Sequence, residues 1–331
     1  PGVEGQMLDI EETLRNLREN ALTSLISQSA ILQMTPISPQ LNDLMPVMSD
    51  IETVTTQELS LSAYDPITDE TYHWSVIDEL KNTWVTVDPE AYQVQLSLNR
   101  ENIEPIIKSW EADMGDGYFF ADLPDWEDLI TMWQEGQEIH ATVHHSPTSY
   151  LVSPGENLIT ISSKVGIPMW YILEANPGLT VSNLQTGMNL KIPSKNILLP
   201  LPVVPEKRII VDVSDQQMQV FENGKVINTY PISTGVVDSP TMTGVFQIQT
   251  HEINAYASNW DLYMPHFMGI YEAWPGFMNG SHGLPLLSNG HRLWASTLGT
   301  PASYGFIILD LKAAESLFDW AEDGVLVVIT P

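Results

Sequence analysis

The chain has 331 residues, 43% of them apolar, so it is long enough for two or three packed domains and too apolar for long-range disorder. Its 13 Lys and Arg against 42 Asp and Glu give a net charge of −29, which repels nucleic acid and anionic lipid. The absence of Cys excludes disulfides, zinc–thiolate sites and thiol catalysis.

Neither a transmembrane segment nor a leader is visible in the sequence. There is no apolar run of about 18 residues, so we expect no membrane span. The chain begins at Pro1 without a basic and then apolar stretch, and we expect residues 1–7 to be a linker or a trimmed remnant.

The charges are distributed unevenly along the chain. Residues 1–147 carry 27 acids and 5 bases, residues 148–206 carry 3 of each, and residues 207–331 carry 12 and 5. These three compositions predict three structural units, with nucleic acid excluded as a partner.

An amphipathic helix is predicted over residues 8–33. Apolar side chains recur there at helical spacing, at Leu14, Leu17, Ala21, Leu25 and Ile26. We expect this stripe to pack on its own domain, the alternative being a docking helix for a partner. Residues 34–50, rich in Pro and Met, are predicted to be a loop.

The remaining segments up to residue 147 alternate between strand and helix patterns. Strands are predicted over 56–65, 71–76, 92–99 and 138–147, helices over 101–114 and 124–136, and a short helix or strand edge over 75–85. Residues 8–147 therefore read as an acidic α+β domain.

Two features of this domain suggest metal binding, and we favour other interpretations of both. The acids lack the spacing of an EF-hand loop, so a solvated helix face is preferred over calcium for Glu111, Asp113, Asp116, Asp122, Asp125, Glu127 and Asp128. His144 and His145 have no third ligand at suitable spacing and are expected to end a strand. No metal or other cofactor is expected.

Residues 150–193 follow the order strand, turn, helix, helix, strand. They resemble the LysM family at Tyr150, Val152, Gly155, Leu158, Ile161, Gly166, Ile167, Asn176, Pro177, Leu184, Gly187, Leu190, Ile192 and Pro193. The resemblance implies a LysM module over 148–196 that binds peptidoglycan or another N-acetylglucosamine-containing glycan. Its groove would use Pro154, Gly155, Glu156, Asn157, Asn176, Pro177, Gly178 and Leu179. The alternative is a module retained as a structural spacer.

A Pro-rich tether over residues 197–206 leads into a β-rich segment with an Asn-Gly turn at Asn223 and Gly224. Residues 207–331 resemble the L,D-transpeptidase catalytic fold at Ser233, Thr234, Gly235, Thr241, Gly244, Phe246, His282, Gly283, Leu298, Gly299, Ser303 and Gly305. The order of elements in residues 8–147 also resembles the peptidoglycan-binding-like domains that precede such domains. The predicted fold class is α+β multidomain, with a mostly-β C-terminal domain.

The resemblance also implies a cysteine nucleophile, which this chain lacks. His282, Ser303 and Gly305 match the family's site, whereas Phe306 stands at the nucleophile position and Tyr304 and Ile308 replace a His and an Arg. A phenyl ring cannot be acylated. The alternative nucleophile is the Ser303 hydroxyl, three residues earlier.

A dense aromatic stretch precedes this site and allows three interpretations. It contains Tyr256, Trp260, Tyr263, Phe267, Tyr271, Trp274 and Phe277. We favour the core of a lid slightly over a stacking surface for carbohydrate or peptide, and the third interpretation is a contact with another copy of the chain.

Three hypotheses about function follow. The first is a catalytically degenerate, L,D-transpeptidase-like protein, secreted to a bacterial cell wall or surface, with a structural, self-assembling or peptidoglycan-binding role. It allows homo-oligomers or filaments, because contacts that do not close build filaments. The second is an active L,D-transpeptidase, if residue 306 is Cys in the gene or Ser303 substitutes. The third is a monomeric glycan-binding adaptor.

Overall fold

The structure, a computed structural model, describes residues 4–37, 45–88, 91–293 and 295–331. Helices and strands occur throughout, which confirms the predicted α+β class. Contacts divide the chain into two units. The first comprises residues 1–61, 73–108 and 124–139, and the second comprises residues 62–72, 109–123 and 140–331.

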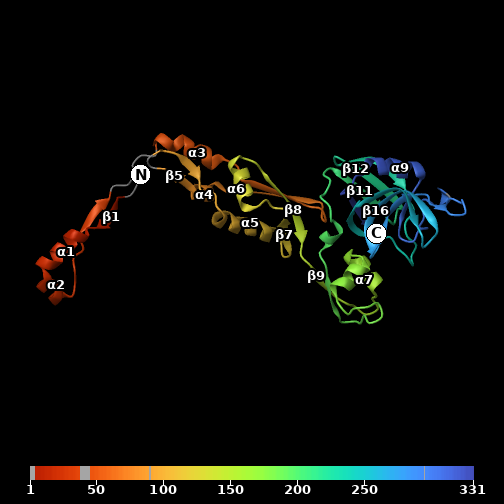
Figure 1. Cartoon of the computed structure of the whole chain (residues 1–331), viewed down its shortest axis with the longest axis horizontal. Helices are drawn as coiled ribbons and strands as arrows, with labels where there is room; N and C mark the ends of the chain where they lie inside the picture. Colours follow the sequence, from red (N-terminus) through yellow and green to blue (C-terminus); the bar gives the residue numbers. More distant parts are fainter. Residues whose placement is uncertain (1–3, 38–44, 89–90, 294) are drawn as a thin grey trace. The chain divides into compact units, whose positions relative to one another are not determined.

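The elements up to residue 145 form a mixed set of short helices and strands (Figure 1). They are β1 (Gly5–Leu8), α1 (Ile10–Glu19), α2 (Ala21–Ser27), β2 (Met34–Ile37), η1 (Met45–Val47), α3 (Met48–Thr56), β3 (Ser60–Asp65), β4 (Glu70–Ser75), α4 (Asp78–Asn82), β5 (Val85–Val87), β6 (Val94–Leu96), α5 (Arg100–Met114), β7 (Tyr118–Ala121), α6 (Trp126–Gln134) and β8 (Ile139–His145).

The single helix predicted over residues 8–33 is wrong. Two helices, α1 and α2, meet at Asn20, whose side-chain amide donates to the carbonyl and side-chain oxygens of Asn16. Short polar side chains that bond nearby backbone in this way compete with helix propagation. The predicted burial of the apolar stripe is wrong as well, since Leu25 and Ile26 are 77% and 78% exposed.

The loop predicted over residues 34–50 is also only partly correct. Residues 34–37 form β2, which pairs with β1, and α3 begins at Met48. Residues 38–44 lie outside the described part of the chain. The pattern missed β2 because its four residues are all exposed and therefore show no alternation.

The predicted helices at 101–114 and 124–136 and the strands at 71–76 and 138–147 are confirmed as α5, α6, β4 and β8. A four-stranded sheet has the order β4-β3-β8-β7, and β7 was not predicted. The indole of Trp133 in α6 is fully buried and donates its N–H to the carbonyl of Ser60. Because the indole N–H keeps a hydrogen-bond partner, the buried ring adds apolar contacts to the core without leaving a polar group unsatisfied.

Residues 148–198 form two strands around two helices, followed by a short turn of 3₁₀ helix. The elements are β9 (Thr148–Leu151), α7 (Leu158–Val165), α8 (Met169–Ala175), β10 (Asn189–Ile192) and η2 (Lys195–Leu198). Asn157 caps α7 by accepting from the Thr160 amide, and Gly166 ends it in the left-handed conformation. The predicted strand, helix, helix, strand order is confirmed.

The C-terminal residues form two sheets and one long helix. The elements are β11 (Lys207–Asp212), β12 (Gln217–Glu222), β13 (Lys225–Pro231), β14 (Gly244–Gln247), β15 (Thr250–Ala257), β16 (Leu262–Trp274), β17 (Phe277–Gly283), β18 (Leu286–Leu287), η3 (Ala295–Thr297), β19 (Ile307–Leu309), α9 (Leu311–Trp320) and β20 (Leu326–Thr330).

One sheet has the order β13-β12-β11-β20-β14, and the other has the order β15-β16-β17-β19 with β18 on β16. Asn223 and Gly224 both have positive φ in the two-residue turn between β12 and β13, as predicted for an Asn-Gly hairpin. In the second sheet β17 and β19 are parallel, and this pairing places His282 opposite Ile308.

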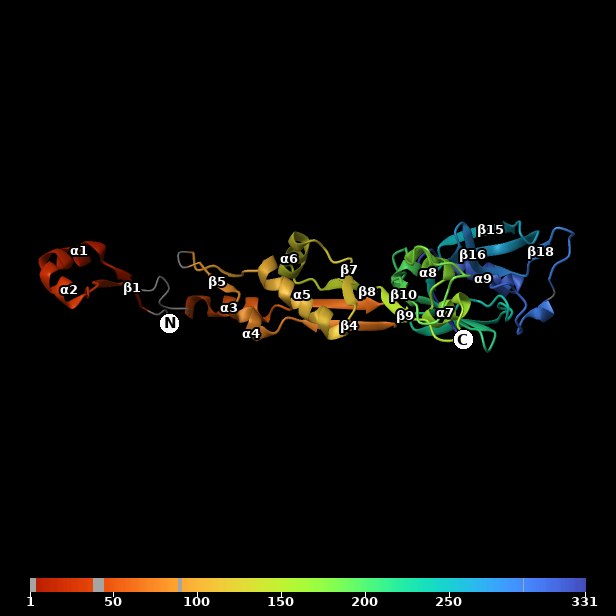
Figure 2. The same ribbon diagram turned by 90° about the horizontal axis from the view of Figure 1, so that it is seen from below.

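A single apolar core joins residues 148–198 to the C-terminal sheets. Ile161 and Ile172 of the helices belong to the same buried cluster as Phe246 and Met268 of the strands. The indole N–H of Trp170 donates to the Glu272 carbonyl across this contact, at 2.7 Å. Figure 2 shows α7 and α8 beside these sheets.

The Pro-rich segment after Leu198 is held by hydrogen bonds to other residues of the second unit. The buried side chain of Gln247 accepts from the Leu201 amide and donates to the Leu201 carbonyl. It also donates to the Gly324 carbonyl, while the Val204 amide bonds the same carbonyl. The segment thus lies along the fold as a strap, which explains how a stretch with three Pro stays ordered without joining a sheet.

Replacing Gln247 by Leu tests this strap. The change leaves the Leu201 amide and carbonyl without their partner, so we expect the free energy of unfolding to fall by about 1–3 kcal/mol. Urea unfolding measures the loss, and proteolysis near residues 199–205 should become faster. Gln217→Leu is the matched control because Gln217 is exposed. Equal effects of the two changes would contradict the role of the strap.

Candidate functional site

The parallel pairing of β17 and β19 brings the predicted remnant site together. His282, Ser303, Tyr304, Phe306 and Ile308 all line one cavity of about 180 Å³. The other lining residues are Trp260, Leu262, Pro285, Leu287, Leu293 and Ala302. Of these, sequence reasoning had singled out only Trp260, because single Leu, Pro and Ala residues carry no motif.

His282 is a buried imidazole with an assigned tautomer. Its Nδ1 lies 2.7 Å from the Gly283 carbonyl oxygen, which can only accept, so Nδ1 carries the proton and Nε2 has a free lone pair. Burial lowers the pKa of His282 to about 4, against a smaller opposing effect of the bond to Gly283. The ring is therefore neutral at pH 7, and no described residue hydrogen-bonds Nε2.

Phe306, which the sequence analysis predicts to stand at the nucleophile position, is packed on several sides. It is 6% exposed, and its ring lies 5.3 Å from that of His282 and 5.9–6.4 Å from those of Trp260, Phe267 and Phe277. Ala255 and Ala257 belong to the same buried cluster. Because small side chains and edge-on rings surround it, the phenyl group fits without the overpacking expected of a site built for a thiol.

Ser303 and Gly305 hold the loop that precedes Phe306. The Ser303 hydroxyl donates to the Phe306 carbonyl at 2.6 Å and accepts from the Gly305 amide at 3.1 Å. Gly305 has φ +104°, and a Cβ there would lie 2.8 Å from the Asn279 amide nitrogen. The hydroxyl proton of Ser303 thus points at a backbone carbonyl, and no other residue type fits easily at Gly305.

Predicted motif residues that precede the site in the sequence form hydrogen bonds with the same loop. Thr241 accepts from the Gly235 amide and donates to the Gly305 carbonyl, both at 2.9 Å. Gln216 bonds both the hydroxyl and the amide of Thr234. These buried polar groups satisfy each other, which rigidifies the loop. Sequence reasoning did not assign a role to Gln216.

The aromatic stretch divides between core and surface. Phe267 and Tyr271 are buried, as the lid interpretation requires. Tyr256, Tyr263 and Trp274 are 39–51% exposed. At the mouth of the cavity Tyr304 is 62% exposed, with its ring nearly parallel to that of Trp260 at 6.2 Å between centroids.

Three of the predicted glycan-groove side chains are already engaged. Glu156 accepts from the Tyr150 hydroxyl, the Ser153 amide and Lys164, and these bonds lower its pKa to about 2, with the Lys164 bond contributing most. Asn157 caps α7, and Asn176 bonds both the amide and the carbonyl of Lys191. The exposed groove residues are Pro154, Gly155, Asn157, Pro177 and Gly178, and Leu179 is half-buried. Of these five, Asn157 alone has its side chain engaged in a helix cap.

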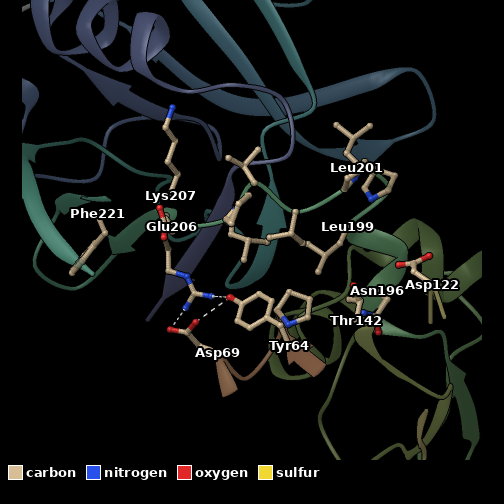
Figure 3. Close-up of a pocket in the computed structure, with 18 of the residues that line it drawn as sticks. Tyr64, Asp69, Asp122, Thr142, Asn196, Leu199, Leu201, Glu206, Lys207 and Phe221 are labelled. Atoms are coloured by element: carbon tan, nitrogen blue, oxygen red, sulfur yellow. Dashed lines mark hydrogen bonds and ion pairs between the residues drawn. The ribbon is translucent and has the colours of Figure 1, made fainter. Parts of the chain in front are cut away.

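A second, larger cavity of about 1090 Å³ lies in the second unit and contains none of the predicted site residues. Arg208 bonds both the Asp69 carboxylate and the Tyr64 hydroxyl there (Figure 3). Burial is the main cause that raises the pKa of Tyr64 to about 12, so the hydroxyl stays protonated at neutral pH. Leu199 and Leu201, in the Pro-rich strap after Leu198, line another side of this cavity.

Two further features bear on function. The described residues contain no group of three or more His, Asp or Glu side chains arranged to hold a metal ion. No helix within the described ranges combines the length and apolar character that a bilayer crossing requires.

Comparison with known families identifies two regions of the chain. Residues 206–329 match the model of the YkuD L,D-transpeptidase catalytic domain, and residues 150–193 match that of the LysM domain. An assigned L,D-transpeptidase YkuD from Bacillus licheniformis is 26% identical over 182 residues, which cover 55% of this chain and 98% of the relative. The corresponding Bacillus subtilis protein is 31% identical over 106 residues, covering 32% of this chain and 62% of the relative.

Solved structures of L,D-transpeptidases show a distant likeness. An Enterococcus faecium L,D-transpeptidase mutant is 16% identical, with 86% of this chain and 99% of that chain covered and a TM-score of 0.41. For the Mycobacterium smegmatis enzyme the identity is 18%, the coverage 38% of this chain and 59% of that chain, and the TM-score 0.33. The assignment of the two domains therefore rests on the family models.

Replacing Phe306 by Ala tests its packing role. The substitution removes the phenyl ring and leaves a cavity among the four rings around it. The free energy of unfolding should therefore fall by about 3–5 kcal/mol. Urea unfolding measures this loss. Tyr304→Ala, two residues away, serves as the control because Tyr304 is 62% exposed, and we expect its effect to stay below about 1 kcal/mol. A loss at Phe306 as small as that of the control would contradict the packing account.

The buried His282 should also make stability depend on pH. With a folded-state pKa of about 4, against about 6.5 when unfolded, its contribution is complete above pH 6.5. As the pH falls towards 4, the unfolded chain binds a proton that the folded one does not. The free energy of unfolding should therefore decrease by at most about 1.4 kcal/mol per pH unit.

Titration of the His282 ring by NMR, assigned with a His282→Gln sample, checks this dependence. The folded protein should keep the neutral-ring signal down to about pH 5, whereas the same ring in urea should titrate near pH 6.5. A folded-state midpoint above pH 6 would contradict the assignment of a buried neutral imidazole.

Proposed function

Because residues 206–329 form an L,D-transpeptidase-like domain and residues 150–193 a LysM domain, we propose that this chain is a non-catalytic cell-wall protein that binds N-acetylglucosamine-containing glycan. The single observation that carries this proposal is the buried phenyl ring of Phe306 at the nucleophile position of a chain without Cys. Acyl transfer through a covalent intermediate requires a nucleophile there.

The alternative enzyme would need Ser303 or a cysteine encoded at position 306. Ser303 is poorly suited, because its proton is directed at the Phe306 carbonyl, and activating it would cost the bond that shapes the loop. A Cys in the gene would leave unfilled the space that Phe306 occupies among Ala255, Ala257 and the surrounding rings. Both considerations favour a protein that kept the fold and lost the reaction.

The glycan-binding part of the proposal rests on the LysM domain. Its exposed loop residues Pro154, Gly155, Pro177 and Gly178 offer backbone amides and apolar surface, which suit sugar hydroxyls and ring faces. LysM and L,D-transpeptidase domains are typical of proteins associated with the cell wall. We accordingly place this chain outside the bacterial cytoplasm, at the wall or cell surface.

Cosedimentation with insoluble peptidoglycan tests both halves of the proposal. The whole chain should bind, and mass spectrometry of the digested pellet should find no new cross-links and no shortened stem peptides. A double Pro154→Glu and Pro177→Glu variant should lose most of this binding, because charge and bulk enter the groove. Gln185→Glu, exposed in the same domain, is the matched control.

Point changes are required here, because deleting the LysM domain would remove Leu158, Ile161, Ile167 and Ile172 from the shared core and destabilise the sheets. New cross-links in the pellet would restore the enzyme hypothesis. Equal binding by the Pro and Gln variants would leave the LysM domain as a spacer and overturn its proposed role.

Self-association is a second candidate role, favoured by the exposed apolar side chains of residues 5–37. These are Met7, Leu8, Ile10, Leu14, Leu22, Leu25, Ile26, Ile31, Leu32, Met34 and Ile37, each 39–78% exposed. In the helices and strands of this segment, Thr13 is the one buried side chain among the described residues. So little core cannot stabilise a two-stranded ribbon with two short helices in water, and a second copy would supply the missing apolar contacts.

Sedimentation over a range of concentrations tests this role. The average mass should rise above 37.0 kDa, and it should rise further with salt, because salt screens the repulsion between copies of net charge −29. Leu25→Lys combined with Ile26→Lys should return the mass to that of one chain. Val237→Lys, at an apolar residue elsewhere that is even more exposed, should not. A constant mass of one chain in the wild type would exclude self-association under those conditions.

A further inference from the structure

The cavity at the remnant site has the properties of a binding site. Its described lining residues carry no Asp, Glu, Lys or Arg, and His282 is neutral at pH 7, so its walls carry no formal charge. Leu262 and Ile308 are apolar lining residues, and Trp260 and Tyr304 line the cavity with nearly parallel rings. His282 also lines it, and no described residue hydrogen-bonds its Nε2. Mostly apolar walls with a few placed polar groups are typical of small-molecule sites.

We propose that this cavity binds an uncharged pyranose ring bearing an N-acetyl group, as a second glycan site on the L,D-transpeptidase-like domain. The acetamido N–H would donate to Nε2 of His282, and the acetyl methyl would contact Leu262 and Ile308. The sugar ring would lie on the faces of Tyr304 and Trp260. The inference rests on the proposed glycan-binding function, since it identifies a further site for the same class of ligand.

The unbonded Nε2 of His282 is an acceptor without a described partner, and we expect it to select a donor on the ligand. Nδ1 is occupied by the Gly283 carbonyl, and the Ser303 hydroxyl donates to the Phe306 carbonyl and accepts from the Gly305 amide. A ligand buried here can therefore satisfy one N–H or O–H well, and any further buried polar group costs free energy. An acetamido group presents one N–H beside an apolar methyl, whereas the ring hydroxyls can remain in water at the exposed mouth.

The volume and the mouth agree with this ligand. A cavity of about 180 Å³ has room for the acetamido group while the sugar ring stays at the mouth, since an engineered apolar cavity of about 150 Å³ holds a ligand as large as benzene. Tyr304 is 62% exposed, so its ring face is available to solvent and to an approaching sugar. A carboxylate or ammonium group would lack a countercharge in this lining, which disfavours charged peptide ends.

The experiment uses the whole chain, with N-acetylglucosamine as the probe and the His282 ring signal in NMR as the local readout. In the Pro154→Glu and Pro177→Glu variant the LysM groove is disabled. We expect the probe still to shift the His282 signal and to saturate. Adding Tyr304→Ala should weaken this binding by about 3- to 10-fold, through loss of the ring contact.

The matched control is Tyr256→Ala, which removes an equally exposed tyrosine that does not line the cavity. It should leave the dissociation constant unchanged, and Trp260→Leu should weaken binding in the same way as Tyr304→Ala. Glucose, which lacks the acetamido group, and glucosamine, which adds a charge, should shift the His282 signal little.

The outcomes separate the two glycan proposals. Loss of peptidoglycan binding in the groove variant with the His282 shift retained supports both sites. An unchanged His282 signal in folded protein at saturating N-acetylglucosamine overturns the second site and leaves the LysM proposal intact. Equal shifts by glucose and N-acetylglucosamine would also overturn it, because the acetamido group would then not be recognised.

Discussion

The shared apolar core of the second unit is the constraint on which the rest of this structure depends. Side chains from the LysM helices and from both C-terminal sheets belong to one buried cluster, and the Trp170 bond to Glu272 joins the two across it. Neither part can be removed without exposing the other's core. The LysM domain is consequently held in a defined position beside the L,D-transpeptidase-like domain, and a wall glycan bound to one would lie near the other.

The loop at the predicted remnant site is held by hydrogen bonds that are independent of the side chain at position 306. Hydrogen bonds that do not involve the side chain of residue 306 link Gln216, Thr234, Thr241, Ser303 and Gly305. These bonds stabilise the loop whichever side chain stands at the nucleophile position. Phe306 then turns the site apolar, because its ring contributes dispersion contacts where a thiolate would require solvation and a partner.

Sequence reasoning succeeded where the signal was local and specific. The Asn223-Gly224 turn, the order of elements in the LysM domain and helices α5 and α6 follow from turn chemistry and periodicity, and the structure bears them out. It failed at residues 8–33, where a periodic stripe indicated one packed helix. The Asn20 break and the exposed Leu25 depend on local side-chain competition and on missing tertiary contacts, which periodicity does not report.

The sequence by itself determined the inventory of chemistry: no thiol, a strong excess of acids, and motif residues of two families in a fixed order. Only the tertiary structure decided how that inventory is used. It placed His282 opposite Ile308 through a parallel strand pair and buried the imidazole so that it stays neutral. It also directed the Ser303 hydroxyl at a backbone carbonyl. The reason is physical, since burial, tautomer and hydrogen-bond direction depend on neighbours that are distant in sequence.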